Sequence, residues 1–176
     1  MIRVQREDFD IGAEIGRLTG GNRGIGGVAS FVGLVRDMAG GDAIGAMTLE
    51  HYPGMTEKKL AEIEAEAGRR WTLACSLIIH RYGRLEPGDR IVLVVTASAH
   101  REAALASCAF LIDWLKTEAP FWKLEETPAG GKWVAAHAED DAAAKRWDAG
   151  PNDPPLRAGE GRAGVASANE ATGRRD

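Results

Sequence analysis

The residue types that can do chemistry gather where one expected element gives way to the next. The segment Ser98-Ala99-His100-Arg101 stands between an apolar strand pattern and a helical pattern. A helix N-terminus presents unpaired N–H groups and a partial positive charge, so anions bind there. The dipole at this end normally favours acidic side chains, and cations oppose it. The presence of His100 and Arg101 here therefore predicts a site where a bound anion is held. A solvated first turn is the alternative.

A second candidate is Arg36, which ends the apolar segment 28–36 just before a glycine-containing loop. A guanidinium placed there can bind a carboxylate or a phosphate through two parallel hydrogen bonds. A solvated strand end is the alternative interpretation.

Two lysines flank the segment 117–122, TEAPFW. Lys116 lies in the last turn of an expected helix, where a cation interacts favourably with the helix dipole. This structural role is enough to explain a lysine at that position. Lys123 follows Phe121 and Trp122, and partial desolvation there would lower the pKa of its ammonium group and make it a usable acid/base. The alternative is a lysine whose stem covers apolar surface while its ammonium group stays in water.

Other kinds of site are not indicated. The glycine-rich segment 21–27 lacks the GK[ST] ending of a P-loop and precedes a strand pattern. Cys75 and Cys108 lie within strand and helix patterns and are expected as small core residues rather than nucleophiles. No metal or cofactor site is predicted, because metal-ligand spacing is lacking among the histidines, which are His51, His80, His100 and His137.

Composition narrows the class of protein. The chain has 176 residues, of which 44% are hydrophobic and 27% charged, as in globular domains. The net charge of −4 argues against bulk electrostatic binding of nucleic acid. No apolar run is long enough for a membrane span, and the sequence MIRVQREDFD has no secretory-signal pattern. We therefore expect a cytoplasmic protein that binds neither nucleic acid nor membranes.

The composition changes after Trp147. Residues 148–176 include no aromatic side chain and only Leu156 and Val165 as large aliphatics, among several prolines and glycines. Such a segment cannot bury enough surface to offset its ordering entropy. We predict one domain over residues 1–147 and a disordered or loosely attached tail over residues 148–176.

Within residues 1–147, helical and alternating apolar patterns follow one another. Thr56 and Ser98 are predicted to cap helices, and residues 37–42 are predicted to form a loop. Strands are expected at 2–5, 28–36, 43–52, 73–82, 90–97, 121–126 and 132–136, and helices at 11–19, 56–71, 98–119 and 139–147. Because helices separate pairs of strands, the pattern predicts an α+β fold rather than a doubly wound parallel sheet.

Taken together, these segments resemble one family, the large, catalytic (MoaE-like) subunits of molybdopterin synthase. The matching stretches follow the family's order over nearly the whole of residues 1–147, and the tail is not covered. They are VASFVGLVRD (28–37), LEHYPGM (49–55), IIHRYGRLEPGDRIVLVVTASAHREAA (78–104), FLIDWLKTEAPFWKLE (110–125) and AAKRW (143–147).

The resemblance implies an α/β hammerhead with an additional antiparallel β-rich subdomain. It also implies a homodimer within a heterotetramer, in which each large subunit takes a small ubiquitin-like sulfur carrier ending in a Gly-Gly thiocarboxylate. The implied activity is that of a sulfurtransferase. Two sulfurs pass in turn to cyclic pyranopterin monophosphate and form the dithiolene of molybdopterin, a step of molybdenum cofactor biosynthesis.

The family's pocket positions fall on the cations chosen above and on their neighbours. We expect Lys116 to be the principal acid/base and Lys123 its electrostatic partner, with Glu125 orienting Lys123. The sulfur arrives on the partner's C-terminus, so no cysteine nucleophile is needed. Phe31 lines the implied pocket, and the implied substrate-binding residues are Leu34, Val35, Arg36, His100, Arg101, Lys116, Lys123, Leu124 and Glu125.

One position departs from the family pattern. Leu124 stands where many relatives have a basic residue, which softens the local positive potential, although the Lys-x-Glu spacing of Lys123 and Glu125 is kept. Two other functions remain as alternatives. One is a non-catalytic phosphate- or nucleotide-binding module that uses His100 and Arg101 and needs no carrier. The other is a phosphoester hydrolase using His100, which no metal set or activated nucleophile accompanies.

Overall fold

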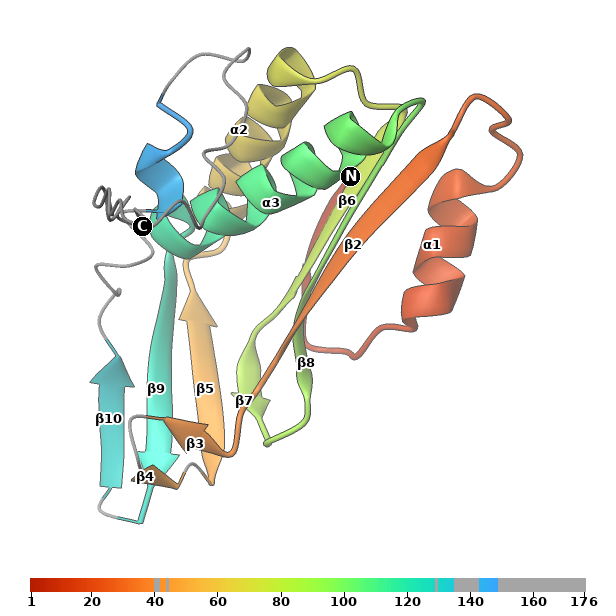
Figure 1. Cartoon of the computed structure of the whole chain (residues 1–176). Coiled ribbons are helices and arrows are strands. Elements are labelled where there is room, and N and C mark those ends of the chain that lie inside the picture. Colours follow the sequence, from red (N-terminus) through yellow and green to blue (C-terminus); the bar gives the residue numbers. More distant parts are fainter. Residues whose placement is uncertain (40–41, 44, 129, 135–142, 149–176) are drawn as a thin grey trace, which may run out of the picture.

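The computed structural model describes residues 1–39, 42–43, 45–128, 130–134 and 143–148. Helices and strands alternate as the pattern predicts, and the α+β class is confirmed (Figure 1). The elements are β1 (Ile2–Gln5), α1 (Ile11–Thr19), β2 (Gly27–Leu34), β3 (Met38–Ala39), β4 (Asp42–Ala43), β5 (Ala46–His51), α2 (Met55–Arg70), β6 (Cys75–Arg81), β7 (Gly83–Leu85), β8 (Arg90–Ser98), α3 (Arg101–Glu118), β9 (Phe121–Thr127) and β10 (Gly130–Val134).

The first sheet has the strand order β1-β6-β8-β2, with β1 parallel to β6 and the other pairs antiparallel. Figure 1 shows α1 on one face of this sheet and α2 and α3 on the other. Successive side chains point to opposite faces of a strand, so Leu77 and Ile79 pack beneath α1 while Ile78 packs towards α2 and α3. A sheet covered on both faces requires apolar residues on both, which explains the near-continuous apolar runs of β6 and β8.

The long helix α3 buries the stripe that its sequence predicts, formed by Ala104, Cys108, Leu111 and Leu115. Its predicted start is wrong, however. Ser98 is the last residue of β8, and its hydroxyl group donates to the carbonyl oxygen of Thr72 at 2.8 Å instead of capping the helix. The N-cap residue of α3 is His100. A serine at the end of a strand can cap the next helix or bond to a neighbouring segment of the sheet, and the local sequence does not reveal which of the two occurs.

The predicted cap of α2 is also displaced. The N-cap is Gly54, whose N–H group donates to the carboxylate of Glu57 at 2.6 Å. Gly54 has a φ of 82°, a conformation that side-chain-bearing residues rarely adopt. Thr56 lies inside the first turn and is completely buried.

The second sheet has the order β10-β9-β5-β7 and is antiparallel throughout. The strands predicted at 121–126 and 132–136 correspond to β9 and β10, which pair antiparallel, and β10 begins two residues before its predicted start. The sequence pattern does not predict β7, because its three residues are too few to show alternation. The predicted loop 37–42 instead contains β3 and the first residue of β4, and these two short strands pair with each other.

The two four-stranded sheets meet at a small apolar cluster. Val35, which follows β2, packs there against Met47 and Leu49 of β5 and against Leu85 of β7. The end of β2 is therefore tied to the inner face of the second sheet, the face on which Met47 and Leu49 lie.

The last described segment returns to the main core. The predicted helix 139–147 begins outside the described residues, and a single helical turn is seen at 143–145. Trp147 is 6% exposed and packs edge-on to Trp71 and Phe110. Its indole Nε1 donates to Asp113 at 2.7 Å. The predicted tail, apart from residue 148, lies outside the described residues.

Within the described residues, no helix has the combination of length and apolar character needed to cross a bilayer. The same residues contain no cluster of three or more His, Cys, Asp or Glu side chains placed to hold a metal ion.

Candidate functional site

Lys123 and Glu125 form an ion pair on the inner face of β9. They stand opposite Leu49 and Met47 of β5, and residues two apart on a strand share a face. The Lys123 Nζ atom lies 2.7 Å from Oε1 of Glu125, whose side chain is only 8% exposed, against 30% for the lysine. A nearly buried carboxylate thus holds a partly exposed ammonium group in place.

Leu124 points away from this pair. Its register partners are Trp133 of β10 and Thr48 of β5, on the outer face of the second sheet. Trp122 lies on the same outer face and is 51% exposed, so it does not desolvate Lys123 as the sequence suggested. Strand alternation therefore separates Leu124 from the residues with which the family resemblance groups it.

Lys116 lies in the last turn of α3 and is exposed. Only Ala119 and Pro120 separate the end of this helix from the start of β9, which carries Lys123. The two predicted catalytic lysines thus lie on consecutive elements that meet at one short corner.

Arg36 follows directly on the cluster that joins the sheets. Val35 is 3% exposed and packs against Met47 and Leu49, the residues paired across the strands with Glu125 and Lys123. The exposed Arg36 lines a cavity of about 550 Å³ together with Asp37 and the turn residues Pro87 and Gly88. Arg36, just after β2, therefore lies at the junction of the two sheets.

Phe31 and Leu34 are unusually exposed apolar residues, at 40% and 52%. Both lie on β2, the edge strand of the first sheet. The register with β8 shifts between Gly33 and Leu34, and Leu34 lines a second cavity of about 490 Å³ with Ile11 and Arg90.

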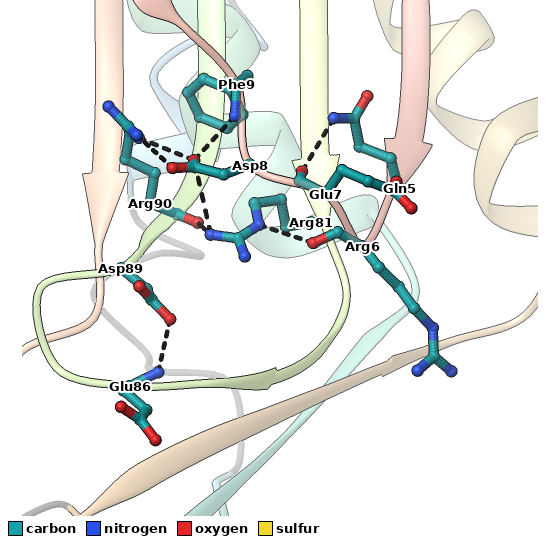
Figure 2. A network of polar contacts seen from close by, with 9 residues as sticks. All are labelled: Gln5, Arg6, Glu7, Asp8, Phe9, Arg81, Glu86, Asp89 and Arg90. Carbon is teal, nitrogen blue, oxygen red and sulfur yellow. Dashed lines mark hydrogen bonds and ion pairs between the residues drawn. The ribbon is translucent and has the colours of Figure 1, made fainter.

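One wall of this second cavity is fixed by a polar network that the sequence did not indicate (Figure 2). Asp8 accepts hydrogen bonds from Arg90 Nε and from the N–H group of Phe9, each at 2.8 Å. Arg81 donates to the carbonyl oxygens of Arg6 at 3.0 Å and of Arg90 at 2.9 Å. Chiefly because of the hydrogen bond from Arg90, the pKa of Asp8 falls to about 2. The network joins residues about 80 positions apart, so no local pattern could reveal it.

His100 and Arg101 stand at the start of α3, and both are exposed. The described residues provide no side-chain cap for this helix N-terminus; the hydroxyl of Ser98 accepts from the N–H group of His100 at a long 3.4 Å. A helix start with an arginine, a histidine and open N–H groups is suited to binding an anion.

The structure does not bring all the predicted cations together. His100 and Lys116 are sixteen positions apart on α3, which corresponds to about 24 Å along a helix. A Cβ atom on Gly27 would lie 3.2 Å from Cα of Arg101, so the start of β2 lies beside the start of α3. Arg36 is nine residues further, about 30 Å along an extended strand. One chain therefore carries two separate ends: an anion-binding candidate end with His100 and Arg101, and a lysine end with Lys116 and Lys123.

Two histidines to which the sequence gives no function form an aromatic cluster beside the lysine end. His80 of β6 stacks on Phe121 of β9 with ring centroids 3.7 Å apart, and His51 lies 4.5 Å from the ring of Tyr82. Burial lowers the pKa of His80 to about 4, aided by nearby His51. The stack packs the first sheet against the beginning of β9.

Cys108 is buried in the core as expected, whereas Cys75 is only partly buried. Burial raises the pKa of the Cys108 thiol to about 11 and also raises that of Cys75. Neither is activated as a thiolate nucleophile, since a reactive cysteine has a lowered pKa.

The fold and the site together define an α+β protein in which a buried carboxylate positions a lysine and further cationic side chains are exposed, an arrangement that could act on an anionic substrate. The chain belongs to the MoaE protein family, whose sequence model matches residues 4–118. It is 56% identical to the molybdopterin synthase catalytic subunit of Pseudomonas aeruginosa over 147 residues, which cover 84% of this chain and 98% of that protein. The corresponding subunit of Ralstonia nicotianae is 56% identical over 146 residues, 83% of each chain. The family recognised from the sequence motifs is confirmed.

Solved structures show the same likeness. The molybdopterin biosynthesis MoaE protein from Burkholderia ambifaria superposes with a TM-score of 0.73 at 55% identity, over 84% of this chain and 97% of that one. Molybdopterin synthase from Staphylococcus aureus has a TM-score of 0.70 at 31% identity, over 76% and 96%. A chain from the complex of subunits 1 and 2 of molybdopterin-converting factor from Helicobacter pylori, at 19% identity and a TM-score of 0.63, shares the fold.

Proposed function

We propose that this chain is the sulfur-transferring subunit of a molybdopterin synthase. Its substrates are the thiocarboxylated C-terminus of a small ubiquitin-like carrier and cyclic pyranopterin monophosphate, and its product carries the molybdopterin dithiolene. The observation that carries the proposal is the Lys123–Glu125 pair of β9, next in the chain to the helix end bearing Lys116. The activity of the relatives supports the reaction, and the two-subunit complex from Helicobacter pylori supports a partner subunit.

The residues fit the chemistry of acyl thiocarboxylate transfer. The thiocarboxylate sulfur forms a bond to a carbon of the pterin side chain, from which an oxygen leaves, and water adds to the carrier's acyl carbon as its C–S bond breaks, so that the carrier leaves as a carboxylate. Protons must therefore move, and negative charge develops. Lys116 acts as the acid/base. Lys123, fixed by Glu125, stabilises the developing charge. His100 and Arg101 bind the substrate's phosphate at the N-terminus of α3.

A reconstitution assay tests this function. Wild-type chain, thiocarboxylated carrier and the cyclic pterin phosphate should yield dithiolene, and Lys116→Ala should nearly abolish the product while the fold and carrier binding persist. Lys58→Ala, on the exposed surface of α2, is the control and should retain activity. Wild-type-like turnover by Lys116→Ala would remove the catalytic assignment. Phosphate binding without any capture of a Gly-Gly-ending carrier would favour the non-catalytic binding module instead.

The separation of the two cationic ends supports a homodimer in which each site draws on both copies. Within one chain, His100 lies about 24 Å along α3 from Lys116. The edge strand β2 runs between the two ends and exposes Val28, Phe31 and Leu34. An apolar, unpaired edge is suited to a second copy, and a twofold axis would bring the anion-binding end of one chain towards the lysine end of the other.

Subunit complementation tests this arrangement. Chains carrying Lys116→Ala are mixed and re-equilibrated with chains carrying His100→Ala and Arg101→Ala. Each mixed dimer then contains one intact site, so about one quarter of wild-type activity should return. No recovery, or a monomer by light scattering at the assay concentration, would contradict the shared site.

The hammerhead arrangement and a cytoplasmic location are further expectations from the family.

A further inference from the structure

The corner between α3 and β9 determines how the two predicted catalytic lysines face each other. Lys116 precedes this corner and Lys123 follows it. Pro120 lies in the corner, and the N–H group of Phe121 donates to the carbonyl oxygen of Ala119 at 2.8 Å. A small rotation at Ala119 or Pro120 would therefore move one lysine relative to the other.

The first turn of α2 contacts this corner from a distant part of the chain. Thr56 is completely buried, and its Oγ1 lies 3.0 Å from the carbonyl oxygen of Tyr52 and 3.5 Å from that of Pro120. The same oxygen accepts from the N–H group of Tyr52 at 3.2 Å. The nearer carbonyl, that of Tyr52, is the main acceptor of the hydroxyl hydrogen, and the buried hydroxyl group lies between the start of α2 and the carbonyl group of Pro120.

A second contact lies one helical turn further along α2. Lys59 Nζ is 2.8 Å from Oε2 of Glu118, the last residue of α3. The two side chains are 34% and 49% exposed, and ion pairs with such exposure add little to stability. Thr56 and Lys59 are three positions apart and so share one face of the helix.

We propose that Thr56 and Lys59 are positioning residues that hold the 119–120 corner, and with it the Lys116–Lys123 geometry, through Pro120 and Glu118. This inference rests on the proposed function, since its catalytic consequence is measured on dithiolene formation. From the other side, His80 stacks on Phe121 at 3.7 Å. The corner is thus held between α2 and β6.

Kinetics of the reconstituted complex test the inference. Lys59→Met should lower kcat about tenfold with KM nearly unchanged, because small displacements of reacting groups are costly. Its thermal midpoint should shift by less than about 3 °C, as for an exposed ion pair. The matched control is Lys58→Met, the exposed neighbour on the same helix, which should retain wild-type kcat. The exchanged pair Lys59→Glu with Glu118→Lys should recover most of the lost rate.

Thr56 provides a second, independent variant. Thr56→Val keeps the shape but removes the hydroxyl group and should lower kcat, whereas Thr56→Ser should restore it. Amide hydrogen exchange at Phe121 reports on the corner without any need for activity, and it should accelerate about threefold in Lys59→Met but not in Lys58→Met.

The outcomes separate the two proposals. Unchanged kcat and unchanged exchange in Lys59→Met, or failure of the exchanged pair to recover the rate, would overturn the positioning role. An inactive wild-type complex would overturn the proposed function, and hydrogen exchange at Phe121 would still decide whether Lys59 holds the corner.

Discussion

Lys123 and Glu125 lie on the same face of β9 with 2.7 Å between Nζ and Oε1, and the carboxylate is almost completely buried. The next residue, Glu126, lies on the opposite face and pairs with Arg84 at 3.2 Å in an exposed setting. One strand thus carries two adjacent glutamates, one facing the proposed site and the other facing solvent.

These neighbours provide a matched test of the lysine pair. Glu125→Gln should lower the rate of dithiolene formation at least about tenfold, because removing one member of a hydrogen-bonded, partly buried charge pair leaves the other misplaced. Glu126→Gln should change the rate by less than about twofold, as expected for an exposed pair. Equal effects of the two substitutions in single-turnover assays would contradict a site confined to the inner face.

Leu124 provides a test of the opposite kind. Because it points to the outer face with Trp133, Leu124→Gln should leave kcat within about twofold of wild type. The measurement is the steady-state rate at saturating substrate and carrier. A tenfold loss would show that this side chain reaches the reacting groups despite its place on the strand.

His80 predicts an acid-sensitive stability. Its pKa is about 4 in the folded chain against 6.5 unperturbed, so the unfolded state binds more protons between these values. The contribution of His80 to the free energy of unfolding should therefore be constant above pH 6.5. It should fall by up to about 3 kcal/mol as the pH is lowered to 4. Urea unfolding at pH 5.0 and 7.5 measures the difference.

The control for this effect keeps the ring and removes the titration. His80→Phe preserves stacking on Phe121 and should flatten the pH dependence between 5 and 6.5. Asp8 does not interfere, because its pKa of about 2 confines its own effect to more acidic solutions. An unchanged slope in His80→Phe would assign the acid sensitivity to another group.

The Asp8–Arg90 pair predicts a modest contribution to stability. Asp8→Asn should lower the free energy of unfolding at pH 7 by about 1 kcal/mol, a value limited by the 47% exposure of the carboxylate side chain. The lowered pKa of Asp8 means that its contribution is present above pH 3.8 and is lost as the pH falls towards 2. Denaturant unfolding at pH 7 checks the loss, and a variant as stable as wild type would contradict it.

Much of the architecture follows from local patterns. Alternation predicts β5, and helical spacing predicts the buried stripe of α3, because side-chain burial repeats with the period of each element. The predicted helix caps at Thr56 and Ser98 are wrong. In both cases the hydroxyl group donates to a carbonyl oxygen instead of accepting from the N–H groups of the helix's first turn. The position of that carbonyl depends on how the surrounding backbone folds, which the residue type does not reveal.

The family, the α+β class and the identities of the cations that could act on an anionic substrate are all readable from the sequence. Which of these cations are neighbours depends on the tertiary structure. The rigid length of α3 places His100 and Lys116 at opposite ends, and the pairing of β9 with β5 turns Leu124 outwards and Glu125 inwards. The contacts of Asp8 with Arg90 and of Lys59 with Glu118 join residues about 80 and 60 positions apart, so they arise only when the elements pack.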